Sequence, residues 1–81
     1  MQTYFVYVVR CVDGTLYTGI TTDVERRTGE HNTSPKGSRY TRARRPVQIV
    51  YTKKYKNRAE ASVEESRIKK LNRQQKINFI T

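Results

Sequence analysis

The stretch TYFVYVVRCVDGTLYTGIT, residues 3–21, decides the fold of this chain. Residues 3–9 within it are mostly aromatic and β-branched, which is typical of a strand buried on both faces. Asp13-Gly14 is a hairpin signal, and residues 15–21 supply a second strand-forming segment. The stretch therefore predicts an antiparallel hairpin at the start of the chain.

The length of the hairpin loop determines which side chains share a face of the sheet. A two-residue loop would place Tyr7 and Tyr17 on opposite faces. A three-residue loop that ends in a left-handed Gly14 pairs Tyr7 with Gly19 and places both tyrosines on one face. The sequence permits both registers. We expect the second, because it gathers two phenols on one surface and so builds a site.

Beyond the hairpin, the sequence predicts a helix, a basic connection and a third strand. Residues 22–25 fit a capping box, so a helix is expected over residues 23–31. Residues 32–45 hold five basic residues and no aliphatic side chain larger than Ala, which indicates an ordered surface loop or short turns. A third strand is expected from residues 46–51, with proline at its entrance, where a missing N–H is tolerated.

The remainder of the chain predicts helices. Asn57, followed three residues later by Glu60, signals the start of a helix over residues 58–71. Asn72 is a candidate cap at the end of that helix, and residues 74–79 are expected to add a short last helix. The order β-β-α-β-α-α predicts an α+β fold, in which a small three-stranded antiparallel sheet is flanked by helices.

Size and charge limit the functional classes. The 81 residues suffice for one domain, which we expect to extend from residue 1 to residue 81. Lysine and arginine total 17 against 7 acidic residues, which gives a formal net charge of +10. This excess favours a polyanionic partner, because neutralised phosphates release their condensed counterions. Charge alone does not separate a nucleic-acid enzyme from a binding module or a ribosome-associated protein.

Cysteine usage and hydropathy bear on the cellular compartment. Cys11 is the only cysteine and follows an apolar run, so it is expected to pack there and not to act as a nucleophile or metal ligand. The sequence shows neither a secretory signal pattern nor an apolar run near the ~20 residues of a membrane span. We therefore expect a cytoplasmic protein with no membrane partner.

Helical spacing places two polar residues at the inner face of the first helix. Arg27 and His31 follow Val24 on the stripe that is expected to face the sheet. The alternative for His31 is a histidine at the helix end that interacts with the helix dipole and the last carbonyls.

A carboxylate also falls inside an apolar stripe. Glu65 shares the stripe of Ile68 in the helix expected over residues 58–71. Burying a carboxylate is costly unless the group is paired or holds a cation. The structural alternative is an ion pair of Glu65 with Arg27 or Lys69. The neighbouring Glu64 lies one step round the helix and is expected to face solvent.

Four segments in this order resemble motifs of the GIY-YIG nuclease superfamily. They are Phe5-Val6-Tyr7, Tyr17-Thr18-Gly19, the run from Gly19 to Arg27, and Glu65-Ser66-Arg67-Ile68-Lys69. The resemblance covers nearly the whole chain and is greatest for the small stand-alone bacterial members. Phe5 stands where the first motif has Gly, and Thr18 where the second has Ile. The tyrosines and the structural glycine, Gly19, are present, and the family's late Asn has no secure counterpart.

The resemblance implies phosphodiester hydrolysis assisted by one divalent ion, Mg²⁺ or Mn²⁺, with Glu65 as its protein ligand. It also implies that Arg27 stabilises the negative charge of the transition state. Tyr17 would act as the general base or orient the attacking water, with Tyr7 beside it. His31 would hydrogen-bond within the same cleft or assist with the proton.

Contacts with the nucleic-acid backbone are expected from basic side chains of the connection and the long helix. These are Lys36, Arg39, Arg42, Arg44, Arg45 and Lys69. The alternative for the basic connection is a solvated surface loop. We expect DNA rather than RNA, little intrinsic sequence specificity, a monomer, and a protein partner as a candidate source of specificity. The rival functions are a non-catalytic module that binds nucleic acid or ribosome on the same fold, and a module that binds an acidic protein.

Overall fold

The computed structural model describes residues 3–80, so residues 1, 2 and 81 of the expected domain lie outside the described residues. Its elements follow one another in the order predicted, with one short helix added. They are β1 (Tyr4–Arg10), β2 (Leu16–Thr21), α1 (Val24–Thr33), α2 (Arg39–Arg42), β3 (Gln48–Tyr55), α3 (Arg58–Lys69) and α4 (Arg73–Ile80).

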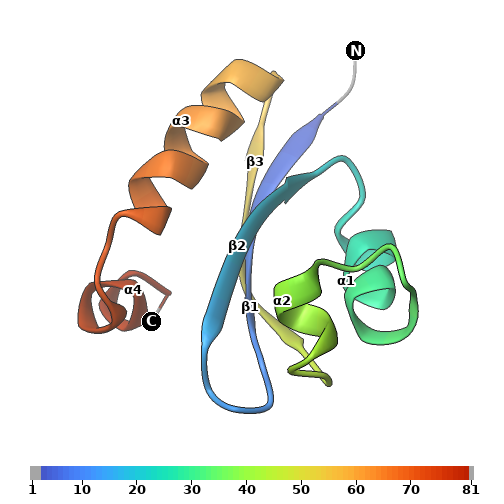
Figure 1. Cartoon of the computed structure of the whole chain (residues 1–81). Helices are drawn as coiled ribbons and strands as arrows, with labels where there is room; N and C mark the ends of the chain where they lie inside the picture. The colour runs from blue at the N-terminus through green and yellow to red at the C-terminus, as the bar shows by residue number, and fades with distance from the viewer. Residues whose placement is uncertain (1–2, 81) are drawn as a thin grey trace.

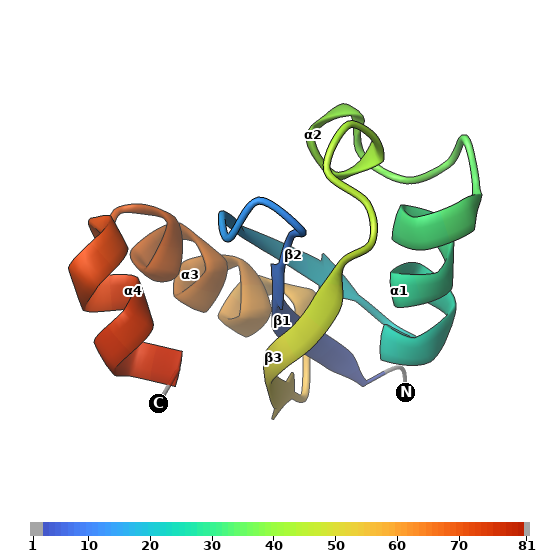
Figure 2. The ribbon, with the colours of Figure 1, turned by 90° about the horizontal axis from the view of Figure 1, so that it is seen from below.

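The three strands form one antiparallel sheet in the order β2-β1-β3, which places β1 at its centre. The helices α1 and α2 lie on one side of this sheet, and α3 and α4 lie on the other (Figure 1, Figure 2). The predicted α+β fold is confirmed. No helix of residues 3–80 has the length and apolar character needed to cross a membrane.

The hairpin adopts the register that we expected. Tyr7 pairs with Gly19 and Val9 pairs with Tyr17, so both tyrosines project from the same face. Gly14 closes the loop with a φ of 85°, a left-handed conformation that glycine adopts without steric cost. The three-residue loop is therefore confirmed.

Each face of the sheet carries its own small core. On the α3 and α4 side, the buried cluster consists of Val6, Val8, Ala61 and Ile68. On the α1 and α2 side, it consists of Tyr7, Val9, Cys11 and Val47. Cys11 is thus packed, as expected. The alternation of strand side chains places Tyr7 and Tyr17 on the α1 side and their neighbours Val6 and Thr18 on the α3 side.

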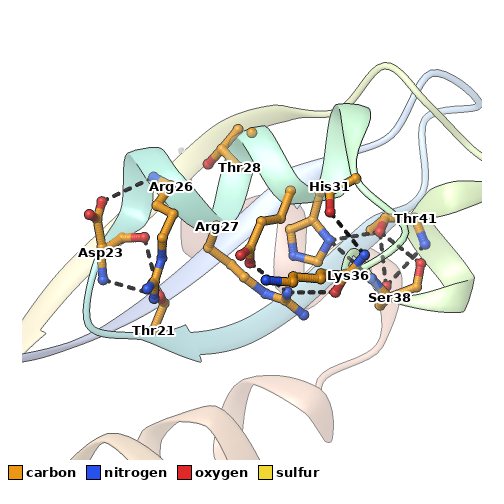
Figure 3. Close-up of polar contacts among 12 residues, drawn as sticks. Thr21, Asp23, Arg26, Arg27, Thr28, His31, Lys36, Ser38 and Thr41 are labelled. Carbon is orange, nitrogen blue, oxygen red and sulfur yellow. Dashed lines mark hydrogen bonds and ion pairs between the residues drawn. The ribbon is translucent and has the colours of Figure 1, made fainter.

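The cap of α1 lies one residue later than the predicted capping box. Asp23 is the N-cap, and its side chain accepts a hydrogen bond from the Arg26 N–H at 3.0 Å. The Thr21 hydroxyl in turn accepts from the Asp23 N–H at 3.1 Å. These bonds fix the direction in which α1 leaves β2, and they are drawn in Figure 3.

The basic connection is more ordered than a surface loop. It contains the single-turn helix α2, which begins at the N-cap Ser38 and includes the fully buried Thr41. The expectation of a surface segment is wrong at Thr41, because this side chain packs against α1 through hydrogen bonds. Asn32 also fastens the connection, since its side chain bonds both the N–H and the carbonyl of Val47 at 2.7 and 3.1 Å.

The third strand is longer than predicted. β3 continues through Tyr55, and it lies at the edge of the sheet opposite β2. Its last residues include the exposed Lys53 and Lys54, which suppress the apolar pattern that sequence reasoning uses. An edge strand tolerates such residues because solvent is available on its outer side.

The two C-terminal helices each begin with an asparagine. Asn57 caps α3 by accepting from the Glu60 N–H at 2.8 Å, as predicted. Asn72 does not cap the end of α3. It forms a capping box with Gln75, in which the side chain of each accepts from the backbone N–H of the other at 2.9 Å, and so it starts α4.

Candidate functional site

A chain of buried hydrogen bonds connects β1 to α1 and α2. The Tyr7 hydroxyl lies 2.8 Å from Nε2 of His31, and Nδ1 of the same ring lies 2.7 Å from Oγ1 of Thr41. Tyr7 is 2% exposed, while His31 and Thr41 are fully buried. Of the two possibilities for His31, the structure therefore shows contact with the tyrosine side chain. The carbonyls at the end of α1 are bound instead by Arg45.

Burial keeps the side chains of Tyr7 and His31 uncharged. It lowers the pKa of His31 to about 4, and the positive charge of Arg27 lowers it further in the same direction. Burial also raises the pKa of Tyr7 to about 12, although Arg27 opposes this rise. At neutral pH the imidazole is therefore neutral and the Tyr7 phenol keeps its proton.

The position of Tyr7 depends on the missing side chain of Gly19. A Cβ atom at Gly19 would lie only 2.5 Å from the Tyr7 hydroxyl oxygen. The tyrosine therefore crosses directly over the backbone of β2 to reach α1. Only glycine fits at this position without displacing the ring.

Arg27 reaches the same region from the first turns of α1. Its Nη1 donates to the Glu30 carboxylate and to the Lys36 carbonyl, both at 2.9 Å (Figure 3). Its side chain is 25% exposed. The hydrogen bond from Arg27 holds the pKa of Glu30 below its ordinary value. The guanidinium is thus held beside Tyr7 and remains open to solvent.

Glu65 approaches from α3, on the other side of the sheet. Its side chain is 24% exposed and lies 3.2 Å from Nζ of Lys69. The expectation of a carboxylate buried in the apolar stripe is wrong, and the ion pair with Lys69 is present. The charge of Glu65 is the smallest of the contributions that raise the pKa of Tyr7, after burial and Tyr17.

Glu64 does not face solvent, contrary to expectation. Its side chain is 13% exposed and accepts hydrogen bonds from Tyr55 at 2.9 Å and from Arg67. The hydrogen bond from Arg67 lowers the pKa of Glu64. This carboxylate therefore joins α3 to β3 and is separate from the tyrosine cluster.

Tyr17 is the less buried tyrosine of the pair. Its ring meets the His31 ring edge-on, with 5.3 Å between the ring centroids. It also stacks on Tyr40 of α2 at 6.0 Å, and the Arg44 guanidinium lies 3.9 Å from the centroid of the Tyr40 ring. The Tyr17 phenol is half-buried and belongs to the same cluster as Tyr7 and Arg27.

The basic residues predicted to contact nucleic acid divide into two groups. Lys36, Arg39 and Arg42 are exposed. Arg44 pairs with Asp13 at 3.1 Å and packs on Tyr40. Arg45 donates to the carbonyls of Glu30, His31 and Ser34 at the end of α1. The structure thus places the last two side chains in contacts within the protein.

The donor set limits the metal that this region could bind. Residues 3–80 contain no group of three or more His, Cys, Asp or Glu side chains arranged to hold a metal ion. A tightly coordinating zinc site is therefore not present in that part of the chain. Mg²⁺ commonly keeps several waters and uses one or two carboxylates together with substrate phosphates. The single, partly exposed carboxylate of Glu65 fits that second kind of site.

A family comparison agrees with this geometry. The model of the GIY-YIG catalytic domain matches residues 3–78. The chain belongs to the GIY-YIG family. The resemblance inferred from the four motifs is thereby confirmed, and it applies across β1, β2, α1 and α3. GIY-YIG domains are of nuclease type, generally use a divalent metal, and have nucleic acid as the expected substrate.

The similar proteins are small members of this family. The UPF0213 protein SAG0778 of Streptococcus agalactiae is 49% identical over 76 residues, which are 94% of this chain and 85% of that protein. The UPF0213 protein DP2720 of Desulfotalea psychrophila is 60% identical over 68 residues, which are 84% of this chain and 62% of that protein. The match therefore spans less than two thirds of the Desulfotalea protein.

Two solved structures share the GIY-YIG fold seen here. The UPF0213 protein BH0048 of Bacillus halodurans superposes with a TM-score of 0.63 and 41% identity, covering 96% of this chain and 82% of that chain. The protein EF2693 of E. faecalis superposes with a TM-score of 0.67 and 44% identity, covering 99% and 84%. Both were solved in solution by NMR.

The candidate site residues named from the sequence did not include two side chains of this cluster. Thr41 and Tyr40 lie in a single-turn helix, which is too short to show a hydrophobic period. One local signal existed, because Ser38 stands three residues before Thr41 and caps its N–H at 3.1 Å. That signal indicates a helix start, but it gives no information about the contact with His31.

Proposed function

We propose that this chain is a divalent-metal-dependent endonuclease that hydrolyses phosphodiester bonds in DNA, and in RNA as a second substrate, with little intrinsic sequence specificity. The observation that carries the proposal is the cluster of Tyr7, Tyr17 and His31 beside α1. The Tyr7 hydroxyl is held by His31 of α1, the half-buried Tyr17 packs against the same cluster, and Arg27 lies one helical turn before His31. Phosphodiester hydrolysis uses a group that activates water, a cation that stabilises the phosphate and a ligand for a divalent ion, for which Tyr17, Arg27 and Glu65 are our candidates.

Arg27 is the group suited to bind the phosphate. Glu30 and the Lys36 carbonyl both bind its Nη1, so they fix the guanidinium plane. The other N–H donors of the fork remain for Tyr7 and for non-bridging phosphate oxygens. A donor fixed in advance stabilises developing negative charge without reorganisation during the reaction.

The two tyrosines take different roles. Tyr7 is buried, has a pKa near 12 and is bonded to His31, so it stays protonated and holds its place. Tyr17 is half-buried and is the phenol that solvent can reach. Tyr17 therefore orients the attacking water and accepts its proton.

Glu65 would hold the divalent ion, with water and substrate phosphate completing the coordination. The ion supplies Lewis-acid polarisation of the phosphate when it is bound. Lys69 pairs with Glu65 in this structure and would exchange that contact for the ion or the phosphate. The exposed cations Lys36, Arg39 and Arg42 contact the backbone and carry no sequence information.

Cleavage of labelled branched, nicked and single-stranded DNA, and of RNA, tests this function in Mg²⁺ or Mn²⁺. Glu65→Gln and Arg27→Ala are expected to abolish a chelator-sensitive cleavage. Two matched controls, Glu60→Gln on α3 and Arg26→Ala on α1, change exposed neighbours of the same charge and should cleave like the wild type.

The possible results separate the competing functions. Cleavage that survives both Glu65→Gln and Arg27→Ala would refute the assignment of the site. Absence of cleavage on every substrate, with salt-sensitive binding retained, would instead assign a non-catalytic nucleic-acid module. Absence of both cleavage and nucleic-acid binding would favour a module that binds an acidic protein.

A further inference from the structure

We propose that Thr41 is a positioning residue: its hydroxyl fixes the ring tautomer of His31, so that Nε2 accepts the hydrogen bond that holds Tyr7 at the site. Thr41 lies on α2 and touches neither Tyr7 nor the open side of the cluster. The proposal deepens the proposed nuclease function and rests on it for its catalytic consequence. The tautomer itself can be measured independently of any activity.

The hydrogen-bond partners of Thr41 determine which atom donates. Its Oγ1 lies 2.7 Å from Nδ1 of His31 and 3.1 Å from the Ser38 carbonyl. A hydroxyl has one proton, and a carbonyl can only accept. The Ser38 carbonyl also accepts from the Arg42 N–H at 2.9 Å. We place the Thr41 proton on this carbonyl, so that the Thr41 oxygen accepts from Nδ1–H of His31. The Ser38 hydroxyl, at 2.9 Å, completes the environment of Oγ1.

The second ring nitrogen then has to accept. His31 is fully buried and neutral, so only one of its nitrogens carries a proton. With that proton on Nδ1, the bare Nε2 accepts from the Tyr7 hydroxyl at 2.8 Å. The opposite tautomer would turn the Thr41 proton to Nδ1 and leave the Ser38 carbonyl with the Arg42 N–H, at 2.9 Å, as its donor. The Ser38 N–H can only donate, and it lies 3.5 Å from Nδ1, so its bond to an unprotonated Nδ1 is at the limit of a hydrogen bond.

This direction of bonding matters for the site. Tyr7 gives its proton to His31, so the lone pairs of its oxygen are free to accept from Arg27. In the reversed tautomer, Nε2–H donates to the Tyr7 oxygen. The Tyr7 proton must then point toward the Arg27 guanidinium, which is itself a donor. The Thr41 hydroxyl therefore controls whether Tyr7 and Arg27 attract or oppose each other.

The first test is the tautomer of His31, read from long-range ¹H–¹⁵N correlation spectra of the untagged chain. His31 is the only histidine, so a single imidazole is observed. We expect Nδ1–H in the wild type and in Thr41→Ser. We expect a shift toward Nε2–H in Thr41→Val, which keeps the shape but removes the acceptor. An Nε2–H tautomer in the wild type would overturn the proposal before any variant is made.

Thr18→Val is the matched control for this spectrum. Thr18 is also buried, at 4% exposed, but it lies on the α3 side of the sheet. Its Oγ1 has no hydrogen-bond partner within residues 3–80. Removing that hydroxyl should leave the His31 signals unchanged. Equal changes in Thr18→Val and Thr41→Val would attribute the effect to general loss of a buried hydroxyl and refute the positioning role.

The second test is the cleavage reaction. Thr41→Val should lower kcat by about 10- to 100-fold with KM little changed, as for other outer-sphere partners that orient an imidazole. Thr41→Ser should have a kcat close to that of the wild type. A Thr41→Val protein with the tautomer reversed and kcat unchanged would refute the catalytic consequence. If the wild type cleaves nothing, the nuclease proposal fails, while the spectrum still decides whether Thr41 sets the tautomer.

Discussion

At the scale of single residues, Gly19 and Tyr7 are a matched pair. A methyl group at Gly19 would lie 2.5 Å from the Tyr7 hydroxyl oxygen, far inside van der Waals contact. Gly19→Ala should therefore push the ring away from His31. We expect a stability loss of about 1–3 kcal/mol from overpacking. Cleavage should fall by about 10²-fold, because a displacement near 1 Å can have that effect. Urea unfolding and single-turnover kinetics measure the two losses.

Gly29 offers a control for this substitution. It lies on the exposed side of α1, and an added Cβ meets no atom within 4 Å. Gly29→Ala should raise stability by roughly 0.5–1 kcal/mol, because alanine favours helix. Cleavage should stay unchanged. A loss of activity in Gly29→Ala similar to that in Gly19→Ala would show that the contact with Tyr7 is not the cause.

His31 should make stability depend on pH in a defined window. Its pKa falls from an ordinary value of 6.5 to about 4 on folding, so the unfolded chain binds the proton more tightly. The stabilisation is complete above about pH 6.5 and is lost as the pH falls toward 4, by at most about 3 kcal/mol. Unfolding by urea at several pH values measures this slope. His31→Gln should flatten it between these limits.

The carboxylates give a separate contribution at lower pH. Hydrogen bonds, from Thr15 for Asp13 and from Arg27 for Glu30, hold the pKa values of both groups below their ordinary values. Their stabilising effect is present above those ordinary values and is lost below about pH 4. A slope between pH 6.5 and 4.5 that persists in His31→Gln would contradict the assignment to His31.

Residue-level inference from the sequence was strong in strands and weaker in helices. The face shared by Tyr7 and Tyr17 follows from loop length and a period of two, and the structure has that register. The depth of Glu64 and Glu65 does not follow from the helical period. Adjacent helical residues are about 100° apart, so a small rotation of α3 exchanges which carboxylate is the more buried. Only the packing of α3 on the sheet decides it.

At the scale of elements, Arg45 joins the end of α1 to the connection before β3. Its guanidinium donates to the carbonyls of Glu30, His31 and Ser34 at the helix end. Arg45→Ala should lower the free energy of unfolding by about 2 kcal/mol, since charged hydrogen bonds and the helix dipole are both lost. The control Arg39→Ala removes an exposed arginine of α2. It should change the free energy of unfolding by less than about 0.5 kcal/mol. Equal effects in urea unfolding would contradict this role.

The elements themselves were predictable where a local signal existed. Asn57 and the Asp13-Gly14 turn mark a helix start and a hairpin in the sequence, and both are present. The helix α2 was not predicted, because a single turn has no period and its stability comes from contacts of Thr41 with His31. Asn72 was placed at the wrong helix because its partner Gln75 follows it in the chain, and an asparagine can stand at either end of a helix.

At the scale of the whole molecule, the predicted partner is a polyanion and the structure suggests which cations contact it. Lys36, Arg39 and Arg42 are exposed on the side of the sheet that carries Arg27. Replacing all three by Gln should make the slope of log binding constant against log salt concentration less steep by about 2–3, at roughly 0.7–0.9 per phosphate contact. Fluorescence anisotropy with a labelled duplex and a single strand at several salt concentrations measures this change.

Three lysines of β3 and the segment after it provide a control of equal charge. Lys53, Lys54 and Lys56 are also exposed, but they lie at the opposite edge of the sheet from β2. Their replacement by Gln removes the same net charge and should change the slope by less than one contact. An equal change in the two triple variants would mean that net charge alone, and not a localised surface, governs binding.

The same lysines bear on how copies of the chain meet one another. The outer side of β3 carries backbone groups that no strand of residues 3–80 pairs with, and such an edge can accept a strand from another molecule. Two β3 strands laid side by side would bring Lys53 and Lys54 of each copy close to those of the other. Like charges in that position repel and also lose hydration. The lysines that hid the end of β3 from sequence prediction therefore protect the sheet against strand-by-strand aggregation.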